Sequence, residues 1–349
     1  MSTHRLIAHF GSLRTTLVLM ALLAGVVLAG TALPLAGGLV LGGAFAALGL
    51  NLLAALVVHP AFRRQLPLLV AHLAGLALLL LVGYGRLASL DGRFELTEGV
   101  PFDGQLLDGA SGPLYAGGLQ RLSFRHEGFQ IDYAPGRKRG ATRNRVTWQD
   151  ADGQLLSATI GDHRPLVIDG HRIYTSPNKG FAPQLTWRPE RGEPQRGVVH
   201  LPSYPMHELA QSREWTLPDG RAVWVQLQFD ETLIDPATAS SFRLPQQHRL
   251  VLRMGQARHE LAPGQGVRVD GGVLQYDGLR TWMGYRVTHD PTLPWLLAAA
   301  LVAAFALLLH YLLKFRQAGP VRVPPPAHVP MPAPPQARPA AWPHEARHG

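Results

Sequence analysis

One histidine stands out because an ionisable side chain is rare in surroundings like its own. His72 lies in the apolar stretch 66–87, LPLLVAHLAGLALLLLVGYGRL, which is as long as the about 20 residues that cross a bilayer core. Ionisable groups at such depth are costly and usually face protein, a cavity or a cofactor. A neutral imidazole there either hydrogen-bonds a neighbour or ligates iron, as the axial ligand of haem does. Placement alone favours the hydrogen bond.

The remaining residues show no catalytic or metal-binding signature. The sequence has no GxSxG, HExxH, P-loop or GxGxxG motif. It has no cysteine, which excludes disulfides, thiolate metal sites and covalent haem attachment to this chain. Asp162-His163 favours a polar strand end over a fragment of a metal site. The sequence therefore favours a protein that is not an enzyme, and an envelope enzyme is the least supported alternative.

The other histidines between 88 and 290 lack the close spacing of metal ligands. They are His126, His163, His171, His200, His207, His248, His259 and His289.

Four apolar segments predict a multi-pass membrane protein. Segments near 13–33, 39–58 and 66–87 form a three-helix membrane region at 1–87, and 291–314 forms a fourth span. A signal peptide is the alternative for the first segment, but the run continues into a second span, which favours an uncleaved hairpin. Asn51 predicts an interhelical hydrogen bond, and His59 beside Pro60 predicts an interfacial side chain.

The positive charges next to these segments predict the orientation. If there are four spans, all of the flanking clusters fall on one side, so both termini are cytoplasmic and 88–290 is outside. A membrane protein with this orientation explains the net charge of +9 better than a nucleic-acid partner does. The clusters are Arg5 with Arg14, Arg63 with Arg64, and Lys314 with Arg316.

Residues 88–290 predict an antiparallel β-rich domain, either a sandwich or an open barrel. Three Asp-Gly turns, at 152–153, 169–170 and 219–220, are flanked by strand-like runs and predict hairpins. Polar residues alternate with Val, Ile, Leu and aromatic residues, as in a sheet with one wet face. Residues 315–349 are rich in Pro and predict a disordered cytoplasmic tail.

Several stretches in their order resemble the ResB/CcsB family of cytochrome c biogenesis system II. The first is GSLRTTLVLMALLAGVVLAGTALP, and the second runs from 66 into FELTEG with the embedded His72. RPLVIDGHRIYTSPNKGFAPQLTWRP and GYRVTHDPTLPWLLAAALVAAFALLLH provide the external and final pieces. The resemblance covers about half of the chain, and its ordered combination is more specific than any single piece.

The resemblance implies a function and a location, namely the bacterial inner (cytoplasmic) membrane, membrane lipid around the spans, and residues 88–290 in the periplasm. Proteins of this family act with a CcsA-type integral membrane partner to carry haem b to the outer face, where it meets apocytochrome c. The family's intramembrane histidine falls on His72, which implies an axial haem ligand with the second ligand from the partner. Arg86 or Arg93 could then counter the propionates, although anchoring at the membrane interface is favoured for both.

An alternative of another class stays open. The chain could be a non-catalytic, membrane-anchored β-domain protein that assembles or binds another envelope complex.

Overall fold

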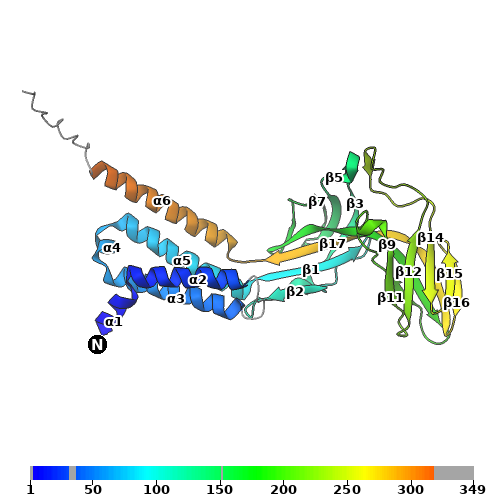
Figure 1. Cartoon of the computed structure of the whole chain (residues 1–349), viewed down its shortest axis with the longest axis horizontal. Helices are drawn as coiled ribbons and strands as arrows, with labels where there is room; N and C mark the ends of the chain where they lie inside the picture. Colours follow the sequence, from blue (N-terminus) through cyan, green and yellow to red (C-terminus); the bar gives the residue numbers. More distant parts are fainter. Residues whose placement is uncertain (1–2, 31–36, 151, 318–349) are drawn as a thin grey trace, which may run out of the picture.

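The computed structural model describes residues 3–30, 37–150 and 152–317. A bundle of helices occupies one end of an elongated molecule, and the β domain extends away from it (Figure 1). The predicted Pro-rich tail and the end of the first predicted span lie outside the described residues, except for residues 315–317, which continue the last helix. The described chain therefore has the predicted division into a helical part and a β part.

The helical part consists of two short and four long helices. Three segments are long and apolar enough to cross a membrane, namely Val40–Val58, Leu66–Ala88 and Leu293–Arg316. The described apolar part of the first predicted span, Leu13–Leu28, is shorter. The helices are α1 (Thr3–Phe10), α2 (Leu13–Gly30), α3 (Gly37–Val58), α4 (Pro60–Arg64), α5 (Leu66–Ala88) and α6 (Leu293–Gln317).

The long helices pack in the chain order α2–α3–α5–α6, and α1 packs on α3. Asn51 of α3 accepts a hydrogen bond from Thr16 Oγ1 (2.8 Å) and donates one to the carbonyl of Phe10. These two bonds confirm the interhelical hydrogen bond that the sequence predicted. Gly11 permits close approach here, because a Cβ at this position would lie 2.8 Å from the backbone nitrogen of Ala55.

The strands in the described β domain all pair antiparallel, as predicted. The sheet nearest the helices has the order β10-β9-β17-β1-β2, with β8 on β9 and β16 on β17. Three further sheets have the orders β11-β12-β14-β15, β13-β4-β5 and β3-β6-β7. The strands are β1 (Leu90–Thr97), β2 (Asp108–Ser111), β3 (Phe124–Gln130), β4 (Asp132–Ala134), β5 (Lys138–Arg139), β6 (Arg143–Gln149), β7 (Leu155–Ile160), β8 (Leu166–Ile168), β9 (His171–Pro189), β10 (Gln195–Val198), β11 (Ser212–Thr216), β12 (Ala222–Gln228), β13 (Ser240–Ser241), β14 (Arg249–Met254), β15 (Ala257–Leu261), β16 (Gly266–Val269) and β17 (Gly272–His289).

The three hairpins predicted from Asp-Gly turns are present. They are β6–β7, β8–β9 and β11–β12. In the second turn both Asp169 and Gly170 have positive φ, the conformation that a two-residue hairpin turn of this kind requires.

Two long strands connect the whole β domain, whereas the sequence predicted only short ones. β9 has 19 residues and β17 has 18, and they pair from Gly272↔Pro189 to His289↔His171. Their register shifts at Tyr276/Gly278 and at Met283/Tyr285. Such bulges bend a strand without ending it, so one strand can serve two packed regions.

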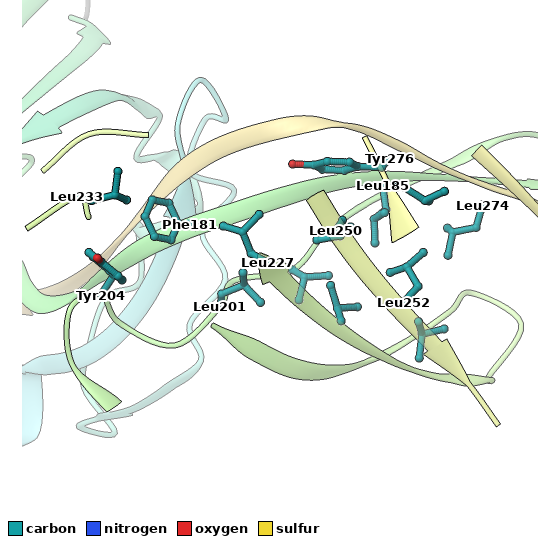
Figure 2. Close-up of a cluster of buried hydrophobic side chains, with 14 of the residues drawn as sticks. Phe181, Leu185, Leu201, Tyr204, Leu227, Leu233, Leu250, Leu252, Leu274 and Tyr276 are labelled. Carbon is teal, nitrogen blue, oxygen red and sulfur yellow. The ribbon is translucent and has the colours of Figure 1, made fainter. Parts of the chain in front are cut away.

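The β domain has two hydrophobic cores along these strands. The core far from the helices gathers side chains of β9, β12, β14 and β17, among them Phe181, Leu252 and Tyr276 (Figure 2). The core near the helices is built around Phe94, Phe124 and Tyr285. Phe129 packs against both cores, so the two are contiguous.

The β domain is joined to the helices by two paired strands. β1 follows α5 almost directly, β17 leads into α6, and Leu90 pairs with His289 across the two strands. Asp290 accepts hydrogen bonds from the backbone nitrogen and hydroxyl of Thr292, at 2.9 and 2.7 Å, just before α6 begins. The base of the β domain is therefore attached to both α5 and α6.

Candidate functional site

The candidate site is a cavity of about 370 Å³ among α2, α3, α4 and α5. This volume lies in the range of small-molecule sites in proteins, about 300 to 1,000 Å³. The walls are mostly aliphatic, and four side chains bring polar atoms to them: Thr16, Asn51, His59 and His72. Such a cavity suits a largely apolar ligand held by a few polar contacts.

His72 reaches this cavity from the first third of α5, and its ring is held in place. Nδ1 lies 2.8 Å from the carbonyl oxygen of Leu68, one turn earlier. A carbonyl can only accept, so Nδ1 carries the proton and Nε2 carries the lone pair. The ring of Phe62 packs edge-on at 4.7 Å between centroids, and no described residue hydrogen-bonds Nε2. The two alternatives drawn from the sequence are thus compatible, since hydrogen bonding uses one nitrogen and ligation would use the other.

This arrangement fits a haem in one axial position. Metal-ligating histidines almost always donate their other ring N–H to a carbonyl, a carboxylate or water, as His72 does to Leu68. His59, on the same cavity, bonds the carbonyl of Gly11 through Nε2 at 3.1 Å. His59 therefore also ties the turn between α1 and α2 to the end of α3.

Arg86 and Arg93, the two candidate partners of the haem propionates, lie far from His72 in the structure. Arg86 follows His72 by 14 positions on α5, which corresponds to about 21 Å of helix. Arg93 lies beyond it on β1 and forms an ion pair with Asp108 at 2.8 Å. One haem ligated by His72 cannot contact either guanidinium, because both are at the opposite end of the bundle.

Asp162-His163 is not a metal site in the structure. Asp162 pairs with Arg139 at 2.8 Å, which helps to keep the pKa of its carboxyl below the usual value, and His163 is exposed. Across residues 3–30, 37–150 and 152–317, no group of three or more His, Asp and Glu side chains could hold a metal ion.

Another histidine of the β domain belongs to a hydrogen-bonded relay that the sequence did not reveal. His200 Nδ1 lies 2.7 Å from Glu95 Oε2, and its Nε2 lies 2.9 Å from Thr97 Oγ1. The ring stacks on Trp282 at 5.0 Å. The connectivity resembles that of a nucleophile–base–carboxylate triad, but Thr97 is only 5% exposed. The relay therefore fastens the segment after β10 to β1 and offers no accessible nucleophile.

A second group of β-domain histidines lies where the β domain meets the helices. His171 Nε2 lies 2.7 Å from the hydroxyl of Tyr115, and the rings of His171 and His289 are 4.6 Å apart. Burial, together with the nearby His289, lowers the pKa of His171. These residues come from the ends of β9 and β17 and from the loop after β2, so no local sequence signal could have joined them.

A histidine in the core near the helices is held neutral. His126 Nδ1 accepts a hydrogen bond from Asn144 Nδ2 (2.7 Å), and Asn144 Oδ1 accepts one from the hydroxyl of Tyr285 (2.8 Å). Burial lowers the pKa of His126 to about 4 and raises the pKa of Tyr285. This network lies within the core near the helices, and none of its residues lines the His72 cavity.

Comparison with known proteins identifies a family. A family model described as ResB-like family matches residues 61–318. A solved structure named Cytochrome c Heme Lyase CcmF is similar at 15% identity and a TM-score of 0.24, covering 86% of this chain and 34% of that one. The chain thus spans about a third of the length of that protein. No curated protein matches the chain.

Proposed function

The chain belongs to the ResB-like family, and we propose from this membership that it is a haem-handling component of cytochrome c biogenesis. It is not an enzyme by itself in this proposal, but it binds haem b and presents it for attachment to apocytochrome c. The observation that carries the proposal is the fixed imidazole of His72, whose Nε2 lone pair is available at an apolar cavity inside the bundle.

The proposal includes a membrane topology. We place four spans in the inner membrane, near 13–33, 39–58, 66–87 and 291–314, with both termini cytoplasmic and the β domain periplasmic. The three apolar helices and the basic residues at one end of the bundle support this arrangement. It puts the cavity of His72 nearer the cytoplasmic end and the base of the β domain at the outer surface.

The proposal also includes a partner. His72 would hold the haem iron through Nε2, and a CcsA-type membrane protein would supply the second ligand, as the family resemblance implies. His59 lines the same cavity, but its Nε2 bonds the carbonyl of Gly11. Haem iron, when bound, supplies the redox chemistry of the complex. This chain's residues hold the imidazole proton at Nδ1, exclude water with aliphatic walls and connect α5 and α6 to the β domain.

The test uses the full chain co-purified with its membrane partner. We expect His72→Ala to remove most of the haem absorbance and to lower cytochrome c yield. His310→Ala is the matched control, because this histidine is also in a long apolar helix but does not line the cavity. An unchanged spectrum in the His72 variant would overturn the proposal and favour a non-catalytic assembly or interaction protein.

A further inference from the structure

At the end of the bundle nearest His72, two neighbouring arginines form no ion pair with any described residue. We propose that Arg63 and Arg64 on α4 form a carboxylate-binding subsite at the mouth of the His72 cavity. The ligand class is a flat apolar molecule with carboxylates along one edge. This inference rests on the proposed haem function and assigns the residues that receive the propionate edge.

The position of α4 is the first argument. This five-residue helix connects α3 to α5, and its Phe62 lines the cavity and packs on His72 at 4.7 Å. Arg63 and Arg64 follow Phe62 directly and are exposed. Along the chain, these two guanidinium groups are the nearest cations to His72.

The charge balance is the second argument. The sequence contains no Asp or Glu before Asp91, so this end of the bundle has no carboxylate of its own. Arg63 Nη2 donates to the carbonyl of Val57 at 3.2 Å, and within the described residues neither arginine makes an ion pair. In contrast, two arginines at the base of the β domain are already paired, Arg93 with Asp108 and Arg286 with Asp91.

The third argument is that the chemical groups of the cavity and of α4 match the different parts of one ligand. An imidazole lone pair, aliphatic walls and two exposed guanidinium groups match iron, a porphyrin face and propionates respectively. Guanidinium groups bind carboxylates in a bidentate manner, which would also orient the ligand with its charged edge toward α4. Guanidinium groups also bind phospholipid phosphates, so the experiment must distinguish haem propionates from lipid phosphates.

The experiment titrates the full chain in nanodiscs of neutral phosphatidylcholine with ferric haem and, separately, with haem dimethyl ester. We expect Arg63→Gln/Arg64→Gln to weaken haem binding about tenfold, the effect of two partly exposed ion pairs. The ester has no propionate charge, so its affinity should be the same in the wild type and in this variant. Lys314→Gln/Arg316→Gln removes two exposed cations from the end of α6, which does not line the cavity, and should change neither affinity.

The other outcomes overturn the inference in distinguishable ways. Equal haem affinity in wild type and Arg63→Gln/Arg64→Gln, with binding that still depends on His72, would overturn the subsite alone. So would an equal loss for haem and its ester, or an equal loss in the Lys314→Gln/Arg316→Gln control. If Arg63→Gln/Arg64→Gln weakens the interaction with phosphatidylglycerol nanodiscs but leaves haem affinity unchanged, the two arginines bind lipid phosphates and not propionates. Haem binding that ignores His72→Ala would overturn the proposed function as well.

Discussion

At the scale of the residue, the chain places imidazoles in three distinct environments. His72 keeps its proton on a backbone carbonyl at the edge of a cavity, and His200 links a carboxylate to a hydroxyl. His126 is fully buried, with Nδ1 as an acceptor and Nε2 without a partner among the described residues. Only the first of these environments leaves a lone pair for a ligand, which is why the functional assignment rests on it.

His126 should make the β domain sensitive to acid. Its native pKa of about 4 lies below the ordinary 6.5, so the unfolded chain gains a proton first as the pH falls. The free energy of unfolding should therefore decline from pH 7 to pH 5 by about 2 kcal/mol on account of this group. Urea unfolding of the full chain in detergent, followed by tryptophan fluorescence, measures the slope.

His126→Gln should flatten this pH dependence, and His163→Gln, an exposed control, should leave it as in the wild type. An identical slope in the His126 variant would show that other groups dominate between pH 7 and pH 5.

At the scale of the element, the close contact of α5 with the start of α6 decides how the β domain is held. A Cβ at Gly85 would lie 2.9 Å from Thr292 Oγ1 and 3.2 Å from Asp290 Oδ1. Gly83, half a turn away, has open space within 4 Å. Gly85 is therefore needed for the close contact of α5 with the start of α6, and Gly83 is not.

Gly85→Leu should separate the two helices and destabilise the chain by about 1 to 3 kcal/mol, as overpacking does. Gly83→Leu should be neutral, because its side chain would meet no neighbour. Thermal unfolding of both variants in the same detergent compares them directly. Equal midpoints would mean that the α5–α6 contact contributes little.

At the scale of the whole molecule, the two cores should unfold together. β9 and β17 cross both cores, and Phe129 contacts both, so neither core is complete if the other is lost. We therefore expect a single cooperative transition for the β domain.

Leu252→Ala tests this cooperativity. Leu252 is 0% exposed in the core far from the helices, so its truncation should cost about 2 to 5 kcal/mol. Fluorescence of the β-domain tryptophans and far-ultraviolet circular dichroism should then shift together. Leu155→Ala, at a side chain that is 69% exposed, should shift neither. Two separated transitions would contradict a single cooperative unit.

The sequence by itself determined the features that depend on a local pattern. Apolar length predicted helices near 39–58, 66–87 and 291–314, because crossing a bilayer requires a continuous run of such residues. Asp-Gly pairs predicted three hairpins, because few residue pairs adopt that turn. His72 was noticeable for the same reason, since its neighbours in the chain are all apolar.

Only the tertiary structure decided which distant residues meet. Glu95 and His200 are 105 positions apart, and the length of β9 and β17 follows from pairing with each other and with separate cores. The same is true of the cavity, where α2, α3, α4 and α5 bring Thr16, Asn51, Phe62 and His72 together. Such contacts arise from packing between elements that are far apart in the chain, and local periodicity contains no information about them.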